Sequence, residues 1–206
     1  MDASAWDERY AARDLVWSVE PNRFVAEIIG PLAPGHAIDV AAGEGRNAIW
    51  MVEQGWTVVA ADYSPVAVER MGSTAADRLG DDSGHLTALV ADATQEAPGG
   101  RGAYDLALLC YLQLPAEEWR QALRAAVEAV RPGGRVVVIG HAGRNLAEGW
   151  GGPSDRAVLY DPEEVLERAE GLPVTVEQSG IRERPVDTDE GERVALDTVV
   201  VLRREG

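Results

Sequence analysis

Two glycines and two aspartates stand close together between Ala37 and Asp62, at a spacing that suits the binding of a nucleoside. Gly43 and Gly45 follow a short apolar run, and residues without a Cβ let the backbone bend sharply and bring its N–H groups close to a ligand. Asp39 interrupts that run, and Asp62 ends the next one. A carboxylate at the C-terminal end of a parallel strand can accept both hydroxyls of a ribose. The stretch is therefore predicted to hold a ribose-containing cofactor.

A strand, a turn, a helix and a second strand are needed to position these groups. Residues 37–41 and 57–61 are apolar runs typical of parallel strands buried on both faces. A helix over about 45–54 joins them, and Gly55 ends it. The N-terminus of this helix points its unpaired N–H groups at the same ligand.

The stretch DVAAGEGRN, residues 39–47, followed by Asp62 after the next strand, resembles the glycine-rich motif of class I S-adenosylmethionine (SAM)-dependent methyltransferases. A dinucleotide-binding protein usually shows G-x-G-x-x-G, whereas the three positions here are Ala41, Gly43 and Arg46. The missing third glycine disfavours NAD or FAD. The alternative is that the glycines only shape a turn in an α/β protein that binds nothing.

The resemblance implies SAM as the methyl donor and S-adenosylhomocysteine (SAH) as the product. Asp92, after a strand over 86–90, would accept a hydrogen bond from the adenine amino group, or be a solvated loop residue. Tyr63 would lie against the adenine ring or be an exposed loop tyrosine. Cys110 is more a small buried residue than a nucleophile, since methyl transfer from SAM needs no covalent enzyme intermediate. The implied cofactor-binding residues are Asp39, Ala41, Gly43, Gly45, Arg46, Asn47, Asp62, Tyr63, Asp92, Ala93, Cys110 and Trp17.

The candidate catalytic residues follow two later strands, over 104–110 and 135–140. His141 is the first candidate to take a proton from an acceptor, with Tyr111 or Glu148 behind it. The alternative for His141 is a structural histidine that bonds the long segment 141–160. That segment leaves the ligand edge of the sheet, and connections so long are usually functional or disordered, so we interpret it as a substrate wall. The predicted substrate-binding residues are Tyr10, Tyr111, His141, Asn145, Glu148 and Tyr160.

Two absences narrow the substrate. The Asn/Asp-Pro-Pro-aromatic box of enzymes that methylate amide or adenine nitrogens is missing after strand 104–110, so such substrates are disfavoured. No acidic set resembles the metal site of catechol-type O-methyltransferases, so no metal is implied. The subgroup that the chain most resembles is the small thiopurine- and tellurite-type methyltransferases, because Gly-Arg-Asn heads the first helix and an aromatic N-terminal segment precedes it.

The family resemblance implies an α/β, Rossmann-like three-layer sandwich. Its seven-stranded sheet would be mostly parallel with an antiparallel last strand. The RPGG turn at 131–134 and strand 135–140 match the family, and a final pair of strands, 173–181 and 195–202, would complete the sheet. The charged hairpin between them is interpreted as a solvated turn, although Arg182 and Arg184 could face the site. One domain over 1–206 is expected, with residues 1–30 as a helical cap over the active site.

The charge of the chain argues against several partners. The net charge is −16, with a pI near 4.5, and no Lys/Arg stripe is present, so nucleic acid is not expected as a partner. No apolar segment indicates export or a membrane span, and a single cysteine fits a reducing cytoplasm. The sequence does not indicate the oligomeric state.

The predicted function is methyl transfer from SAM to a small-molecule acceptor, which would be a thiol or other chalcogen, a hydroxyl or an amine. The alternative is a SAM-binding protein without methyltransferase activity, either a regulator or a catalyst of another reaction in the same pocket. A nicotinamide-dependent oxidoreductase is a remote third hypothesis.

Overall fold

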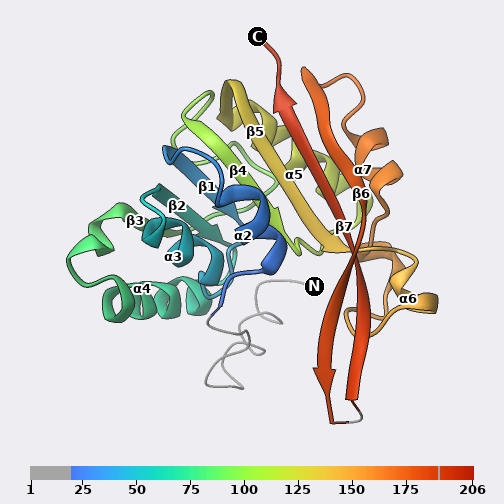
Figure 1. Cartoon of the computed structure of the whole chain (residues 1–206). Coiled ribbons are helices and arrows are strands. Elements are labelled where there is room, and N and C mark those ends of the chain that lie inside the picture. The colour runs from blue at the N-terminus through green and yellow to red at the C-terminus, as the bar shows by residue number, and fades with distance from the viewer. Residues whose placement is uncertain (1–19, 190) are drawn as a thin grey trace.

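A seven-stranded sheet with the order β3-β2-β1-β4-β5-β7-β6 forms the centre of the computed structural model (Figure 1). The structure describes residues 20–189 and 191–206. Strands β1 to β5 are parallel, and β7 pairs antiparallel with both β5 and β6. This confirms the predicted fold class. The strands are β1 (His36–Val40), β2 (Thr57–Asp62), β3 (Leu86–Val90), β4 (Tyr104–Cys110), β5 (Val130–His141), β6 (Val174–Thr188) and β7 (Gly191–Arg204).

Helices cover both faces of the sheet, because the central strands are apolar on both sides (Figure 1). On one face α2, α3 and α4 pack against alternate residues such as Leu106 and Leu108. On the other face α5 and α7 pack against Ala107 and Leu109. The helices are α2 (Arg23–Ile29), α3 (Arg46–Glu53), α4 (Pro65–Leu79), α5 (Ala116–Ala129), α6 (Asn145–Glu148) and α7 (Pro162–Arg168), with short 3₁₀ turns at η1 (Gly80–His85) and η2 (Arg156–Val158).

Local sequence signals set where two of the helices begin. Ser64 caps α4 by accepting the Ala67 N–H at 3.1 Å, and Pro65 opens the helix. A capping box between Asp161 and Glu164 starts α7. None of the helices in the described part of the chain combines the length and apolarity that a membrane crossing requires.

The C-terminal hairpin is longer than predicted. The charged residues 182–193 do not form a short turn: β6 runs to Thr188 and β7 starts at Gly191, so the two strands continue beyond the sheet as a two-stranded ribbon (Figure 1). Charged residues in the ribbon mask its strand character in the sequence, because both of its faces are largely solvated. The ribbon places Arg184 opposite Ala195, close to the end of β5.

The segment 141–160 and the RPGG turn also differ from the prediction. Within 141–160 the chain forms the short helix α6 and the turn η2 rather than only irregular structure. The RPGG residues lie inside β5 as an irregularity, since Tyr104 pairs with Val130 and Leu106 pairs with Arg135.

Candidate active site

A cavity of about 450 Å³ lies where the parallel strands β1 to β4 end. The carboxyl ends of parallel strands meet at one edge of a sheet, so loops far apart in the sequence line the same cavity. Most of the predicted cofactor residues line it, namely Ala41, Gly43, Arg46, Asn47, Asp62, Tyr63, Asp92, Ala93 and Cys110.

The glycine turn has a backbone conformation that few other residues adopt. Gly43 has φ 58° and Gly45 has φ 83°, and Ala41 beside them also has φ 58°. A Cβ on Gly45 would lie 2.3 Å from Met71 Cγ. Gly45 therefore does not line the cavity, but it lets α3 start against α4 and so positions Arg46 and Asn47.

Asp62 holds the glycine turn in place. Its Oδ2 accepts the Gly43 N–H at 2.8 Å, and its Oδ1 accepts the Ser64 N–H at 2.9 Å. The side chain is 8% exposed and faces the cavity. A carboxylate in this position, at the end of β2 and on the cavity wall, suits the binding of ribose hydroxyls.

Asp39 is a buried carboxyl beside the glycine turn. Among the described residues, none makes a hydrogen bond of normal geometry to either of its oxygens, although the charge of Arg46 and the Ala48 N–H both act to lower its pKa. Burial, and then the charge of Asp62, raise its pKa from 3.8 to about 8. Such a group is stabilised by a nearby cation. SAM carries a sulfonium and an ammonium, so this side chain fits that cofactor.

The remaining cofactor candidates differ in their exposure. Tyr63 is 52% exposed at the mouth of the cavity, and Asp92 is exposed with its Oδ1 accepting from Thr94. Asn47 is buried, and its Oδ1 accepts the Asn22 N–H at 2.9 Å. Burial raises the pKa of the Cys110 thiol to about 12, so Cys110 is an inert wall residue. Trp17 lies outside the described residues.

A second cavity, of about 770 Å³, adjoins the first. Both cavities are lined by Arg46, Tyr111 and Gln113. The second cavity is also lined by residues from the start of α2, from the segment after β5 and from the ribbon. These are Pro21, Asn22, Arg23, His141, Trp150, Gly151, Gly152, Pro153, Ser154, Asp155, Val158, Arg184, Pro185 and Val186. Much of the predicted substrate wall thus lies beside the cofactor cavity.

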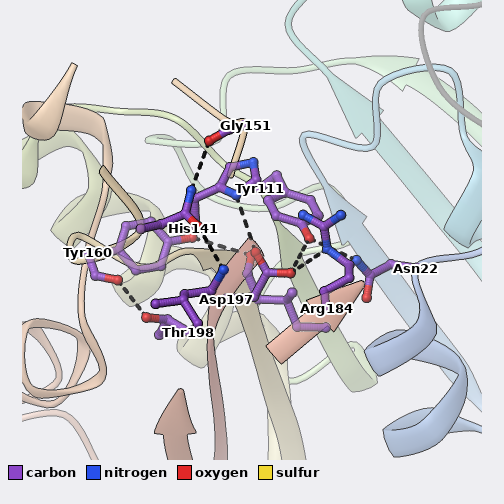
Figure 2. Close-up of polar contacts among 11 residues, drawn as sticks. Asn22, Tyr111, His141, Gly151, Tyr160, Arg184, Asp197 and Thr198 are labelled. Atoms are coloured by element: carbon purple, nitrogen blue, oxygen red, sulfur yellow. Dashed lines mark hydrogen bonds and ion pairs between the residues drawn. The ribbon is translucent and has the colours of Figure 1, made fainter. Parts of the chain in front are cut away.

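A buried carboxylate joins the polar residues between the cavities. Asp197 in β7 is fully buried and lies opposite His141 in β5 (Figure 2). Its Oδ2 accepts the Tyr111 O–H at 2.7 Å and the Arg184 Nε–H at 2.6 Å. Its Oδ1 lies 3.3 Å from His141 Nδ1. Asn22 completes the group by donating its Nδ2–H to Tyr111 Oη at 3.1 Å.

The protonation states in this group follow from its contacts. Burial alone would raise the pKa of Asp197, but its donors His141, Arg184 and Tyr111 outweigh this and hold that pKa below its ordinary value. Burial, and then the charge of Asp197, raise the pKa of Tyr111 well above its ordinary value. Tyr111 is therefore a neutral donor to Asp197 in this structure.

Three predicted substrate residues do not line either cavity. Tyr160 is 1% exposed and packs on Trp119 beneath the sheet, with ring centroids 4.7 Å apart, so we do not retain it as a substrate contact. Asn145 is buried and holds the backbone, accepting the Leu196 N–H and donating to the Gly151 carbonyl. Glu148 is exposed on α6. Tyr10 lies outside the described residues.

The sequence did not reveal Asp197 and Asn22 as residues of the site, and it did not reveal that Arg184 binds Asp197. One signal was present for Asp197: a single acidic residue stands in the apolar run ALDTVVVL. Buried charges need partners, so an aspartate in a buried strand points to a polar site. Within residues 20–189 and 191–206, no three His, Cys, Asp or Glu side chains gather into a group that could hold a metal ion.

Comparisons with known proteins agree with this geometry. A family model described as a methyltransferase domain matches residues 37–134. The chain is 31% identical over 125 residues to a demethylmenaquinone methyltransferase of Clavibacter sepedonicus, covering 61% of this chain and 47% of that protein. The chain thus spans about half the length of this curated relative.

Solved structures share the whole fold at low identity. A structure described as "Conversion of a Disulfide Bond into a Thioacetal Group during Echinomycin Biosynthesis" has a TM-score of 0.79 at 19% identity, covering 98% of this chain and 91% of that one. Magnesium protoporphyrin IX methyltransferase from Synechocystis with bound SAH has a TM-score of 0.65 at 17% identity, with 98% and 83% covered. These similarities show the fold alone. The family match concerns residues 37–134, just under half of the chain, and this stretch is similar to a methyltransferase domain with the fold that these solved structures share.

Proposed function

We propose that this chain transfers a methyl group from SAM to a small-molecule acceptor. The observation that carries the proposal is that a cofactor-sized cavity over the glycine turn meets a second cavity at Arg46, Tyr111 and Gln113. SAM in the first cavity would supply an electrophilic methyl group on a positively charged sulfur. The acceptor would occupy the second cavity, and the shared wall would hold the two reactants in line.

Asp62 and Asp39 would hold the cofactor. Asp62 would accept the ribose hydroxyls, and the buried Asp39 would balance the positive charge of the bound cofactor. Asp92 and Tyr63 at the mouth of the cavity would contact the adenine. The lining of the cavity supports the roles of Asp62, Tyr63 and Asp92. Asp39 lies behind that lining, and its role is supported by its buried oxygens, which have no hydrogen-bond partner among the described residues.

The acceptor cavity would close around its ligand. Residues 21–23 lie on the wall of this cavity, so the segment that precedes them in the sequence is joined to the chain at the cavity. We therefore keep the proposal that the segment before Pro21 forms a cap, which would exclude water from the reacting groups. We also keep a single domain over 1–206 as a proposal. The relatives give no support to the thiopurine and tellurite subgroup, and we do not carry it further.

Two measurements test the proposal. Calorimetry should show binding of SAM and of SAH but not of NAD, and mass spectrometry after incubation with labelled SAM should show a methylated compound from a panel of thiols, phenols, alcohols and amines. SAM binding without any methylated product would favour the alternative, a SAM-binding protein that does not methylate. The absence of SAM and SAH binding to well-folded protein would overturn both.

A further inference from the structure

We infer that Asp197 positions His141 as a general base and that the methyl acceptor is therefore a hydroxyl group. The inference rests on the proposed function, since it concerns the acceptor of that reaction. Asp197 is a positioning residue here, because it acts through His141 and does not line either cavity.

The orientation of His141 is the first step. Its Nδ1 faces Asp197 Oδ1 at 3.3 Å, and both atoms are buried without another hydrogen-bond partner in the described part of the chain. A small rotation of the ring would shorten this contact into a hydrogen bond, and catalytic hydrogen bonds are often long before substrate binds. A carboxylate at this position keeps the proton on Nδ1 and leaves the Nε2 lone pair available. Figure 2 shows the second ring nitrogen on the side of the ring away from Asp197.

The charge of Asp197 is the second step. The guanidinium of Arg184 binds Oδ2 and leaves Oδ1 for His141, so the carboxylate stays ionised although it is buried. An ionised carboxylate stabilises the imidazolium that forms when His141 takes a proton. Among the described residues, the other charged or titratable groups here are Tyr111, whose ring is tilted by 41° against His141 with centroids 4.7 Å apart, and Arg23, Arg46 and Asp155 on the cavity wall.

The acceptor chemistry is the third step. A thiol near pH 8 is partly thiolate and needs little help from a base, whereas a hydroxyl must lose its proton during transfer. An aliphatic amine is mostly protonated at this pH, and the arginines on the cavity wall disfavour that cation. The acceptor oxygen forms a bond to the methyl carbon, the carbon–sulfur bond breaks with its electron pair left on sulfur, and the hydroxyl proton moves to His141 Nε2. Three arginines, Arg23, Arg46 and Arg184, and one carboxylate, Asp155, line the acceptor cavity of a chain with net charge −16. This local excess of positive charge favours the negative charge that develops on the acceptor oxygen.

The activity test compares matched acceptors with the full-length chain. Phenols and alcohols are paired with the corresponding thiophenols and thiols, and labelled SAM reports transfer at pH 8. The wild type should methylate a hydroxyl compound. Asp197→Asn should lower kcat for it by about 100-fold or more, with the acceptor KM and the SAM Kd within about threefold. For any matched thiol that reacts, Asp197→Asn should lower kcat by less than about tenfold.

Further variants separate a positioning role from a structural one. His141→Gln leaves the pair between Asp197 and Arg184 in place and should cause a similar loss, with no further loss in the double variant. It also tests the inference if Asp197→Asn does not fold. The control Glu177→Gln removes another carboxylate bound to an arginine, Arg135, outside the site and should leave kcat unchanged.

A measurement on the free protein needs no activity. Nitrogen-15 NMR of labelled histidine should show the His141 proton on Nδ1 in the wild type, and Asp197→Asn should lose this preference. A proton on Nε2 in the wild type would overturn the inference. So would methylation of thiols alone, or methylation of hydroxyls at unchanged rates in both variants, and each of these results would leave the proposed methyltransferase function intact. No methylation in either series or of the amines in the wider panel, with SAM bound, would overturn the proposed function itself and the inference with it.

Discussion

Single residues with unusual conformations or charges mark the ends of the strands around the cofactor cavity. Ala41 and Tyr111 both have φ 58°, a region that side chains with a Cβ rarely adopt. Each follows a central parallel strand, and each lines the cavity. Strained backbone of this kind costs about 1–3 kcal/mol and persists where the surroundings enforce it. At Tyr111 the hydroxyl donates to Asp197 and accepts the Asn22 Nδ2–H, and these bonds hold the residue in place.

Asp39 predicts a proton release that accompanies cofactor binding. With its pKa at about 8, the carboxyl is mostly protonated in the free protein at pH 7. A bound cation lowers that pKa, so binding of SAM should release a proton and weaken as pH falls from 8 to 6. Calorimetry at pH 7 in two buffers with different ionisation enthalpies gives the number of protons released. The value for the wild type should exceed that for Asp39→Asn by about 0.5–1 proton.

The sign of the effect on stability follows from the same pKa. The unfolded chain ionises this carboxyl with a pKa near 3.8, whereas the folded free protein keeps the proton up to about pH 8. The free wild type should therefore lose stability as pH rises from about 4 to 8, and Asp39→Asn should lack this contribution. Equal proton numbers and equal pH profiles for the two proteins would show that Asp39 is not the linked group.

At the scale of elements, Asn22 connects helix α2 to the site. Its Oδ1 accepts the N–H groups of Phe24 and Val25 at the start of α2, and its Nδ2 donates to Tyr111 Oη. Its backbone N–H reaches Asn47 in α3. One side chain thus starts a helix and fixes the wall shared by the two cavities.

Because Asn22 has these two roles, different substitutions at this position should change the free energy of unfolding and kcat independently. Asn22→Ala should lower the free energy of unfolding by about 1 kcal/mol through loss of the cap, and should also lower kcat. Asn22→Ser keeps a capping oxygen but cannot reach Tyr111, so it should restore most of the stability and leave kcat low. Chemical denaturation and turnover assays measure the two effects. Recovery of kcat in Asn22→Ser would show that the cap alone matters.

At the scale of the whole molecule, the antiparallel strand β7 connects the sheet to the acceptor cavity. Strands β1 to β4 supply the cofactor cavity, whereas β5, β7 and the ribbon supply His141, Asp197 and Arg184. The strands that bind the cofactor and those that meet the acceptor therefore lie side by side in one sheet, so both ligands should bind the folded state only.

Cofactor binding should accordingly stabilise the whole fold. A ligand at 100 times its Kd adds about 2.7 kcal/mol to the free energy of unfolding. For a chain of this size that corresponds to a rise in Tm of about 5–10 °C. Differential scanning fluorimetry with SAH should show this rise, and NAD at the same concentration should show none. An equal rise with NAD would instead support a nicotinamide cofactor.

The sequence by itself determined the glycine turn, the strands around it and the carboxylates near the ends of β1, β2 and β3, and its resemblance to a family implied the α/β sandwich. The turn and the strands depend on local periodicity and on short-range rules for turns and caps, so they can be recognised along the chain. The course of residues 182–193 was missed because a solvated ribbon has no apolar pattern to mark it.

Only the tertiary structure decided which polar residues meet. Asp197 faces His141 because β7 runs antiparallel beside β5 in one particular register, and the ribbon brings Arg184 to the same carboxylate. Packing likewise placed Tyr160 in the core rather than beside the acceptor cavity. Strand pairing and packing bring together residues that are far apart in the chain. Burial and charge compensation stabilise these contacts, and both arise only once the sheet has formed.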